Sequence, residues 1–159
     1  MTQPTEKPVS ASSVTLHRLM LPEHANALGN VHGGEIMKMV DETGAICAMR
    51  HAQRACVTIA MDSMSFQQPV HVGEILSCQA SVNYVGRSSL EVGVKVHAEN
   101  PITGQLTHTN SAYLVYVAID ENGTPCGVPS LRLETDAERR RWEEGRARQE
   151  RRLSKAKKR

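Results

Sequence analysis

Before its charged C-terminal tail, the 159-residue chain carries one pattern of a long helix, at residues 34–51. This segment is apolar on nearly every side. At about 100° per residue, its polar side chains Glu35, Lys38 and Glu42 fall in one narrow stripe, and apolar side chains occupy most other directions. A helix of this kind is buried on most of its sides, so the rest of the domain must surround it.

Extended segments lie on both sides of the predicted helix. Apolar and polar residues alternate through residues 74–84 and 89–98, which is typical of strands with one buried face. Further strands are expected at residues 14–21, 56–66 and 108–119. The alternation in 56–66 changes phase, which predicts a bulge or bend near Asp62 and Ser63. The second half of 108–119 is apolar on both faces, so this strand is expected at the centre of the sheet or at a subunit contact.

The connections between the later strands are short, and this decides how the strands pair. Parallel neighbours need crossovers of about a dozen residues or more, so antiparallel pairing is expected. An apolar helix beside one antiparallel sheet can be hidden only if the sheet curls around it. We therefore predict an α+β fold with a single hot-dog domain, in which a curved antiparallel sheet of about five strands wraps a long central helix. The domain is expected at residues 14–130, between a disordered N-terminus (1–13) and a charged, basic tail (131–159) that is helical in part.

Composition narrows the classes of function. Aromatic residues make up only 3% of the chain, so stacking platforms for single-stranded nucleic acid are poorly supplied and no nucleic-acid partner is expected. The cysteines Cys47, Cys56, Cys78 and Cys126 form no C-x-x-C pair, which favours reduced, buried thiols over a zinc site or disulfides. The polar N-terminus has no hydrophobic signal segment, and no apolar run approaches the roughly 18 residues of a membrane span. A cytoplasmic protein is expected.

The tail differs in charge from the rest of the chain. Residues 134–159 contain 11 Lys and Arg against 6 Asp and Glu, whereas the whole chain has a net charge of +2. A solvated or frayed helix with intermixed charges is the favoured interpretation. Contact with nucleic acid, an anionic membrane or the phosphates of a CoA-type ligand is the alternative.

The stretch GNVHGGEIMKMVDE, residues 29–42, carries the candidate chemistry. Its glycine spacing fits neither a dinucleotide-binding turn nor a P-loop. Gly33 and Gly34 lie where the helix should begin, and there unpaired N–H donors and a partial positive charge can stabilise an oxyanion. Asp41 lies two turns further on, off the polar stripe and beside small residues. A partly desolvated carboxylate in such a position can activate water or attack an acyl carbon.

Structural explanations for the same residues stay open at this point. Asp41 can be a surface acid at the edge of the polar stripe. Asn30 can be a turn-former or an N-cap, and His32 can be a hydrogen-bonding residue of the loop.

The segment GNVHGGEIMKMVDETGA resembles the acyl-CoA thioesterases of the hot-dog fold, the family of brain acyl-CoA hydrolase and its short bacterial relatives. The likeness continues through MDSMSFQQPVHVGE, VNYVGRSSLEVGVKV and HTNSAYLVYVAID, and covers roughly residues 14–130. It implies that Asp41 is the base or nucleophile, that Asn30 positions water or the carbonyl, and that the backbone N–H near Gly34 completes the oxyanion site. It also implies that Asn30 and Asp41 of one site come from different subunits. His32, in the same stretch, is a further candidate site residue.

A second motif of the resemblance is the turn Gly86-Arg87-Ser88-Ser89, which is similar to the family's CoA-contacting turn. An arginine with backbone N–H and hydroxyl donors suits the phosphates of CoA, although an exposed hairpin arginine is the alternative. The resemblance implies hydrolysis of acyl-CoA to a carboxylic acid and CoA, with no metal and no cofactor. It also implies a dimer-based homo-oligomer, with a hexamer built as a trimer of dimers as the first expectation and a tetramer as the second.

Two rival functions remain. A non-catalytic acyl-CoA sensor would keep the CoA turn and could dispense with Asp41. A hot-dog dehydratase acting on acyl chains attached to carrier protein would use a histidine with an acid, usually with Pro-Gly after the histidine, whereas Gly33 and Gly34 follow His32 here. The joint presence of Asn30 and Asp41 favours the hydrolase. The acyl-chain length and the choice between general-base and covalent anhydride mechanisms are left open by the sequence.

Overall fold

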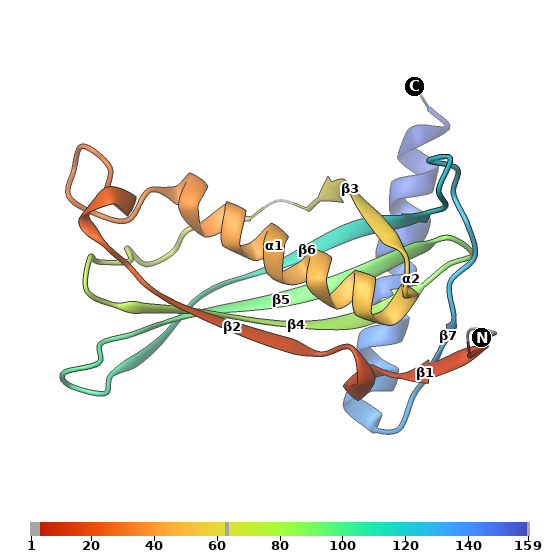
Figure 1. Cartoon of the computed structure of the whole chain (residues 1–159), viewed down its shortest axis with the longest axis horizontal. Helices are drawn as coiled ribbons and strands as arrows, with labels where there is room; N and C mark the ends of the chain where they lie inside the picture. Colours follow the sequence, from red (N-terminus) through yellow and green to blue (C-terminus); the bar gives the residue numbers. More distant parts are fainter. Residues whose placement is uncertain (1–3, 63, 159) are drawn as a thin grey trace.

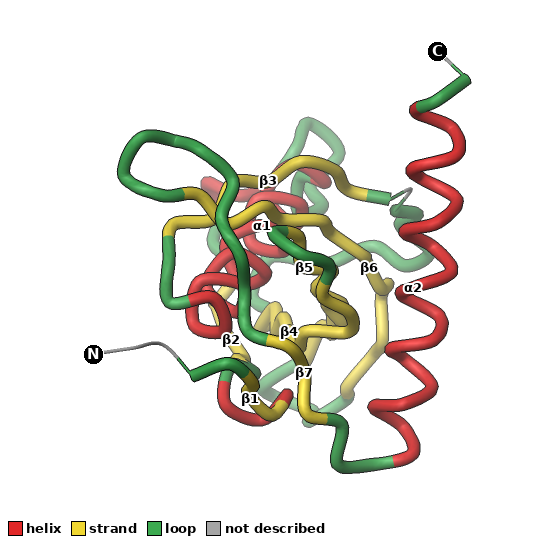
Figure 2. Tube along the Cα trace, turned by 90° about the vertical axis from the view of Figure 1, so that its right-hand side faces the viewer, coloured by secondary structure: helices red, strands yellow, loops and turns green. Residues whose placement is uncertain are grey.

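The computed structural model of the chain describes residues 4–62 and 64–158. Five antiparallel strands form one sheet in the order β2-β4-β5-β6-β3, and this sheet curls around the long helix α1 (Figures 1 and 2). These elements are β2 (Val14–Leu19), α1 (Gly33–Ala52), β3 (Ala55–Met61), β4 (Ile75–Val85), β5 (Ser89–Glu99) and β6 (Leu106–Ile119). The predicted hot-dog fold is confirmed.

Smaller elements and a second helix complete the chain. They are β1 (Glu6–Pro8), the 3-10 turns η1 (Val9–Ala11) and η2 (Pro22–His24), β7 (Ser130–Arg132) and the helix α2 (Asp136–Ala156). Seen from the end of the sheet, α1 lies inside the curve and α2 lies outside it, so the sheet separates the two helices (Figure 2).

The core lies between α1 and the concave face of the sheet. Met39 and Val40 of α1 are fully buried, and so are the inward residues of the central strands, for example Val92 of β5. Val92 pairs with Val82 of β4 on one side and with Leu114 of β6 on the other, so one cross-strand row of apolar residues faces the helix. β6 lies between β5 and β3, which confirms the expected central position of this strand.

α1 is not covered on all sides within one chain. Met37 and Met49 remain 41% and 40% exposed, although the sequence pattern predicted a helix buried nearly all round. Within the described residues the sheet ends at β2 on one side and at β3 on the other, and these two side chains of the helix lie outside the core cluster.

The edge strand β3 also differs from its predicted form. It ends at Met61, and its irregularity falls between Thr58 and Ala60 rather than near Asp62 and Ser63, of which Ser63 lies outside the described residues. Val57 and Ile59 are 40% and 60% exposed. The apolar pattern of this strand therefore includes side chains that the single chain leaves open to solvent, which is unusual for an edge that has no partner.

The prediction of a disordered N-terminus is wrong for the described residues from Pro4 onward. β1 pairs in parallel with β7, and Val9 is buried. Lys7 Nζ donates hydrogen bonds to the carbonyl oxygens of Arg50 and His51 at 2.7 and 3.1 Å. A cation at the C-terminal end of a helix is stabilised by the helix dipole. The composition of residues 1–13 gave no sign of this pairing, because the partner strand comes near the other end of the chain.

The C-terminal tail packs against the outer face of the sheet instead of being solvated, because a negative charge on that face pairs with arginines of the tail. Glu91 of β5 points outward with its side chain only 1% exposed, and Arg148 and Arg152 of α2 both donate to its carboxylate. Arg148 also stacks 3.7 Å from the ring centroid of Tyr113, and Trp142 packs edge-on against Tyr84. The helix is therefore part of the folded domain.

We expect Glu91→Gln to lower the free energy of unfolding by about 3 kcal/mol, because both arginines would lose their buried counter-charge. The measurement is urea unfolding followed by the fluorescence of Trp142, the single tryptophan of the chain. Glu150→Gln is the matched control, since Glu150 pairs with Arg146 at the exposed surface and should matter little. Equal unfolding midpoints for both variants would show that the buried pair does not hold α2.

Candidate active site

The loop before α1 is shaped by Asn26. Its Oδ1 accepts hydrogen bonds from the backbone N–H groups of Leu28 at 2.9 Å and Asn30 at 3.3 Å, and its own N–H donates to the carbonyl oxygen of Asn30 at 2.7 Å. Gly29 completes the turn with a φ of +84°, which a glycine adopts without strain. The backbone of Asn30 forms an isolated β-bridge with His71. Asn30 therefore lies in a turn, as the alternative interpretation of this residue as a turn-former predicts.

The start of α1 is capped by His32. The N–H of Gly34, which the sequence assigned to an oxyanion site, donates to His32 Nδ1 at 2.9 Å. The adjacent N–H of Gly33 has no hydrogen-bond partner within residues 4–62 and 64–158. An oxyanion could reach Gly34 only if the His32 ring moved aside, whereas the Gly33 donor is unpaired and has the Phe66 ring close to it.

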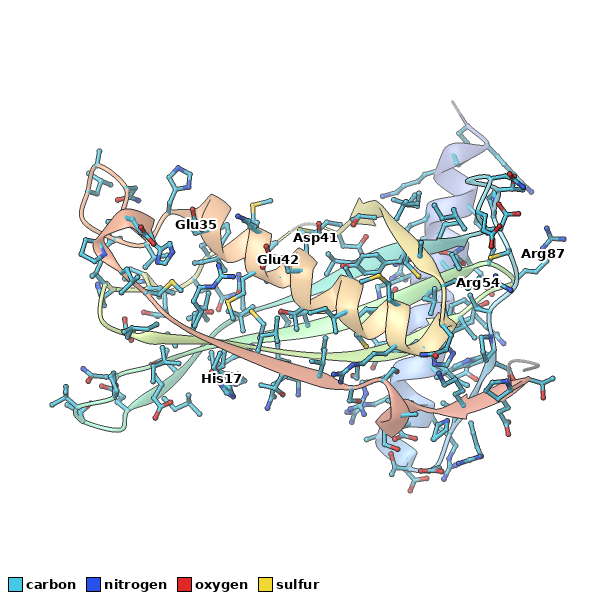
Figure 3. The ribbon with its side chains drawn as sticks, in the orientation of Figure 1. His17, Glu35, Asp41, Glu42, Arg54 and Arg87 are labelled. Carbon is cyan, nitrogen blue, oxygen red and sulfur yellow. The ribbon has the colours of Figure 1, made fainter. Side chains whose placement is uncertain are left out.

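Asp41 is half-buried on α1, and side chains from two strands orient its carboxylate. Thr58 Oγ1 of β3 donates to Asp41 Oδ1 at 2.8 Å, and the Tyr116 hydroxyl of β6 lies 3.0 Å from the same oxygen. No described residue bonds to Oδ2. Because Thr58 is exposed on the edge strand, this carboxylate lies beside the open edge of the sheet, as Figure 3 shows for Asp41.

Sequence reasoning missed both partners of Asp41. Thr58 was detectable as the polar residue between Val57 and Ile59 in an apolar run. Tyr116 could not be singled out from the sequence, because an aromatic residue in an interior strand is normally interpreted as part of the hydrophobic core. Burial and the negative charge of Asp41 raise the pKa of Tyr116 far above its ordinary value, so its hydroxyl stays protonated and able to donate.

The predicted CoA turn joins β4 and β5. It is closed by a hydrogen bond from the Gly86 N–H to the Ser89 carbonyl oxygen at 2.8 Å. The carbonyl oxygens of Arg87 and Ser88 accept from the N–H groups of Val128 and Ala118. The Arg87 side chain is exposed and extends away from the domain, at the opposite end of the molecule from the start of α1 (Figure 3).

One chain therefore does not bring the predicted site residues together. Gly34 and Asp41 are separated by about 10 Å along the axis of α1, and Arg87 lies beyond the far end of that helix (Figure 3). The half-buried carboxylate, the helix start and the CoA turn are three separate places in the chain.

In the described residues, no three His, Cys, Asp or Glu side chains gather as metal ligands, and neither helix is long and apolar enough to cross a membrane. The four cysteines are free thiols. Cys47 and Cys78 are buried, which raises their pKa to about 12 and about 11, whereas Cys56 and Cys126 are only partly buried.

Comparison with known proteins assigns this chain to a family. The sequence pattern of the thioesterase superfamily matches residues 28–105. An uncharacterized acyl-CoA thioester hydrolase of Bacillus subtilis is 34% identical over 138 residues, which cover 87% of this chain and 80% of that protein. The chain belongs to the acyl-CoA thioester hydrolases of the thioesterase superfamily.

Solved structures agree with this membership. An apo-hexameric acyl-CoA thioesterase is 40% identical with a TM-score of 0.90, over 95% of this chain and 97% of that one. The acyl-CoA hydrolase of Staphylococcus aureus, solved with butyryl-CoA, CoA and CoA disulfide, is 33% identical with a TM-score of 0.88, over 96% and 93% of the two chains. Variants of this second hydrolase have also been solved, in which an asparagine, an aspartate fifteen residues later, or a threonine seventeen residues after that is replaced by alanine.

Proposed function

We propose that this chain hydrolyses the thioester of acyl-CoA to a carboxylic acid and CoA, with Asp41 as general base or nucleophile. The observation that carries the proposal is the Asp41 carboxylate, half-buried at the open edge of the sheet, with Oδ1 held by Thr58 and Oδ2 free. Membership of the acyl-CoA thioester hydrolases supports the substrate class. Water is the second substrate and Asp41 supplies the base or nucleophile, so the proposed reaction uses neither a metal nor a redox cofactor.

The general-base form of the reaction uses only the Asp41 carboxylate, one water molecule and the thioester. Asp41 takes a proton from water while the water oxygen bonds to the acyl carbon and the carbonyl oxygen becomes an oxyanion. The oxyanion then collapses, the carbon–sulfur bond breaks, and the proton passes to the thiolate of CoA. In the nucleophilic form, the carboxylate attacks the acyl carbon, the carbon–sulfur bond breaks and CoA leaves as a thiolate, so that Asp41 carries a mixed anhydride. Water then hydrolyses the anhydride to the free acid and the Asp41 carboxylate, and a proton released from this water passes to the thiolate.

We propose that a complete site forms between two chains. β3 has a free edge with exposed Val57 and Ile59, and it carries Thr58 against Asp41. A second copy paired along this edge would cover the apolar side chains and bring its own helix start and loop toward the carboxylate. The hexameric thioesterase among the structural neighbours supports a trimer of such dimers.

Two asparagines of the loop are candidates for positioning water or the carbonyl. Asn30 follows from the family-like motif. Asn26 lies fifteen residues before Asp41, and Thr58 lies seventeen residues after it, so these three repeat the residue types and spacing replaced in the Staphylococcus aureus variants. The Oδ1 of Asn26 is used in the turn, which leaves its amide N–H₂ as the group available to a ligand. The spacing favours Asn26.

We expect Asp41→Asn to reduce acyl-CoA hydrolysis by about 100-fold or more, because an amide cannot serve as base or nucleophile. The assay follows the thiol of released CoA with a chromogenic disulfide reagent. Glu42→Gln, which neutralises the next residue of the helix, is the matched control and should stay near wild type. An Asp41→Asn protein with near-wild-type turnover would refute the proposed function.

The two asparagines are separated by changes that preserve the loop. Asn26→Asp keeps an oxygen for the N–H groups of Leu28 and Asn30 but removes the amide donor, so we expect a fall in kcat of about tenfold or more with an unchanged melting temperature. Asn30→Asp should retain activity. The reverse result would assign the role to Asn30.

We propose that Arg87, with the backbone and hydroxyl donors of Gly86, Ser88 and Ser89, binds the phosphates of CoA. Arg87→Ala should raise KM for acyl-CoA several-fold, by roughly 1 kcal/mol of lost charge-assisted bonding, and change kcat little. The control is Arg140→Ala on the exposed surface of α2. An unchanged KM for Arg87→Ala would remove this turn from the CoA site.

A further inference from the structure

Two hydroxyl groups meet on the same oxygen of Asp41. Thr58 approaches Oδ1 from the edge strand β3, and Tyr116 approaches it from the neighbouring central strand β6. The Tyr116 hydroxyl lies 3.0 Å from both Oδ1 and the backbone carbonyl oxygen of Asp41, so its single proton is shared between two atoms of one residue. The second carboxylate oxygen, Oδ2, receives no hydrogen bond from the described residues.

The approach of Tyr116 depends on a glycine in α1. Gly44 lies three residues after Asp41, on the same side of the helix one turn later. A Cβ at this position would lie 2.4 Å from the Tyr116 hydroxyl oxygen, a separation that real Cβ atoms do not show, and 3.2 Å from two of its ring carbons. Gly44 has an ordinary helical conformation, so the backbone does not require a glycine here. The lack of a side chain is needed for the close approach of Tyr116.

Burial fixes the Tyr116 ring. Its side chain is 0% exposed, and it belongs to the core cluster between α1 and the sheet. A phenol held in this way donates from a defined direction, whereas the exposed Thr58 stands on the edge of the sheet. Tyr116 is therefore the rigid member of the pair that orients the carboxylate.

We propose that Tyr116 is a positioning residue for thioester hydrolysis, which, with Thr58, engages Oδ1 of Asp41 and leaves Oδ2 as the reacting oxygen. This proposal rests on the proposed role of Asp41. In the general-base form, Oδ2 takes the proton of the attacking water while Oδ1 keeps its two donors. In the nucleophilic form, Oδ2 forms the bond to the acyl carbon. In the general-base form, the leaving thiolate of CoA receives the proton that Asp41 took from water. In the nucleophilic form, CoA leaves as a thiolate when the anhydride forms, and it receives a proton when water hydrolyses the anhydride.

The first test is Tyr116→Phe, which keeps the buried ring and removes only the hydroxyl. We expect kcat for acyl-CoA hydrolysis to fall about tenfold, because the carboxylate would lose its rigid partner, while KM changes by less than about twofold. Tyr113→Phe is the matched control: it makes the same change in the same strand, on the opposite face of the sheet, and should leave both constants unchanged. Melting temperatures of both variants are recorded alongside.

The second test uses Gly44→Ala, which leaves Tyr116 in the chain but forces its hydroxyl away from Asp41. We expect this change to lower kcat about as much as Tyr116→Phe does. In a chain that already carries Tyr116→Phe, Gly44→Ala should lower kcat little further. The hydroxyl is then absent, and the aromatic ring has to move by only a few tenths of an ångström to make room for the new Cβ. Costs that multiply fully in the double variant would show that both residues act through packing alone, and would overturn the proposal.

The Asp41→Asn variant, assayed in parallel, distinguishes a failure of the Tyr116 role from a failure of the proposed function. If Asp41→Asn loses activity while Tyr116→Phe keeps kcat within twofold of wild type, the role of Tyr116 is refuted and the proposed function stands. If Asp41→Asn retains near-wild-type turnover, both fail together. A Tyr116→Phe protein that melts earlier yet turns over normally also refutes the positioning role.

Discussion

The burial of α1 in the concave side of the sheet is the constraint on which the rest of the structure depends. A helix with a single narrow polar stripe has to be enclosed, and a single antiparallel sheet can enclose it only by curling. The strand order leaves β2 and β3 at the two edges of the sheet, and the curl brings β3 against the face of α1 that carries Asp41. The same packing that hides the helix therefore brings a carboxylate to the rim of the core.

The enclosure is incomplete on one side, and this is where the chemistry is concentrated. Met37 and Met49 of α1 remain exposed, and so do Val57 and Ile59 of β3, the edge strand that carries Thr58. An apolar edge strand invites pairing with another chain. The half-buried carboxylate of Asp41 at this edge would become enclosed if a second copy covered it, so the two-chain site that we propose would exclude bulk water only in the assembled protein.

The outer face of the sheet is organised by charge instead of by apolar burial. Glu91 is a fully buried acid on the outer face of β5. Its carboxylate forms ion pairs with two arginines of α2, Arg148 and Arg152. Arg152 also reaches Asp62, the residue that follows β3, at 3.5 Å. The C-terminal helix is in this way connected to the end of the strand that holds Thr58, although it lies on the other side of the sheet from α1 (Figure 2).

The sequence by itself determined the fold class, the central helix, the positions of its five main strands, and Asp41 as an acid that does not belong to the polar stripe. These features follow from periodicity, which acts over neighbouring residues and is written directly in the chain. Tertiary structure alone decided that Thr58 and Tyr116 orient Asp41, that His32 occupies the Gly34 N–H, that β1 pairs with β7, and that Glu91 holds the tail. Each of these contacts joins residues on different elements or in a specific loop geometry. Their partners are chosen by how the sheet curls and by which side chains its two faces present, and no local pattern in the sequence encodes that choice.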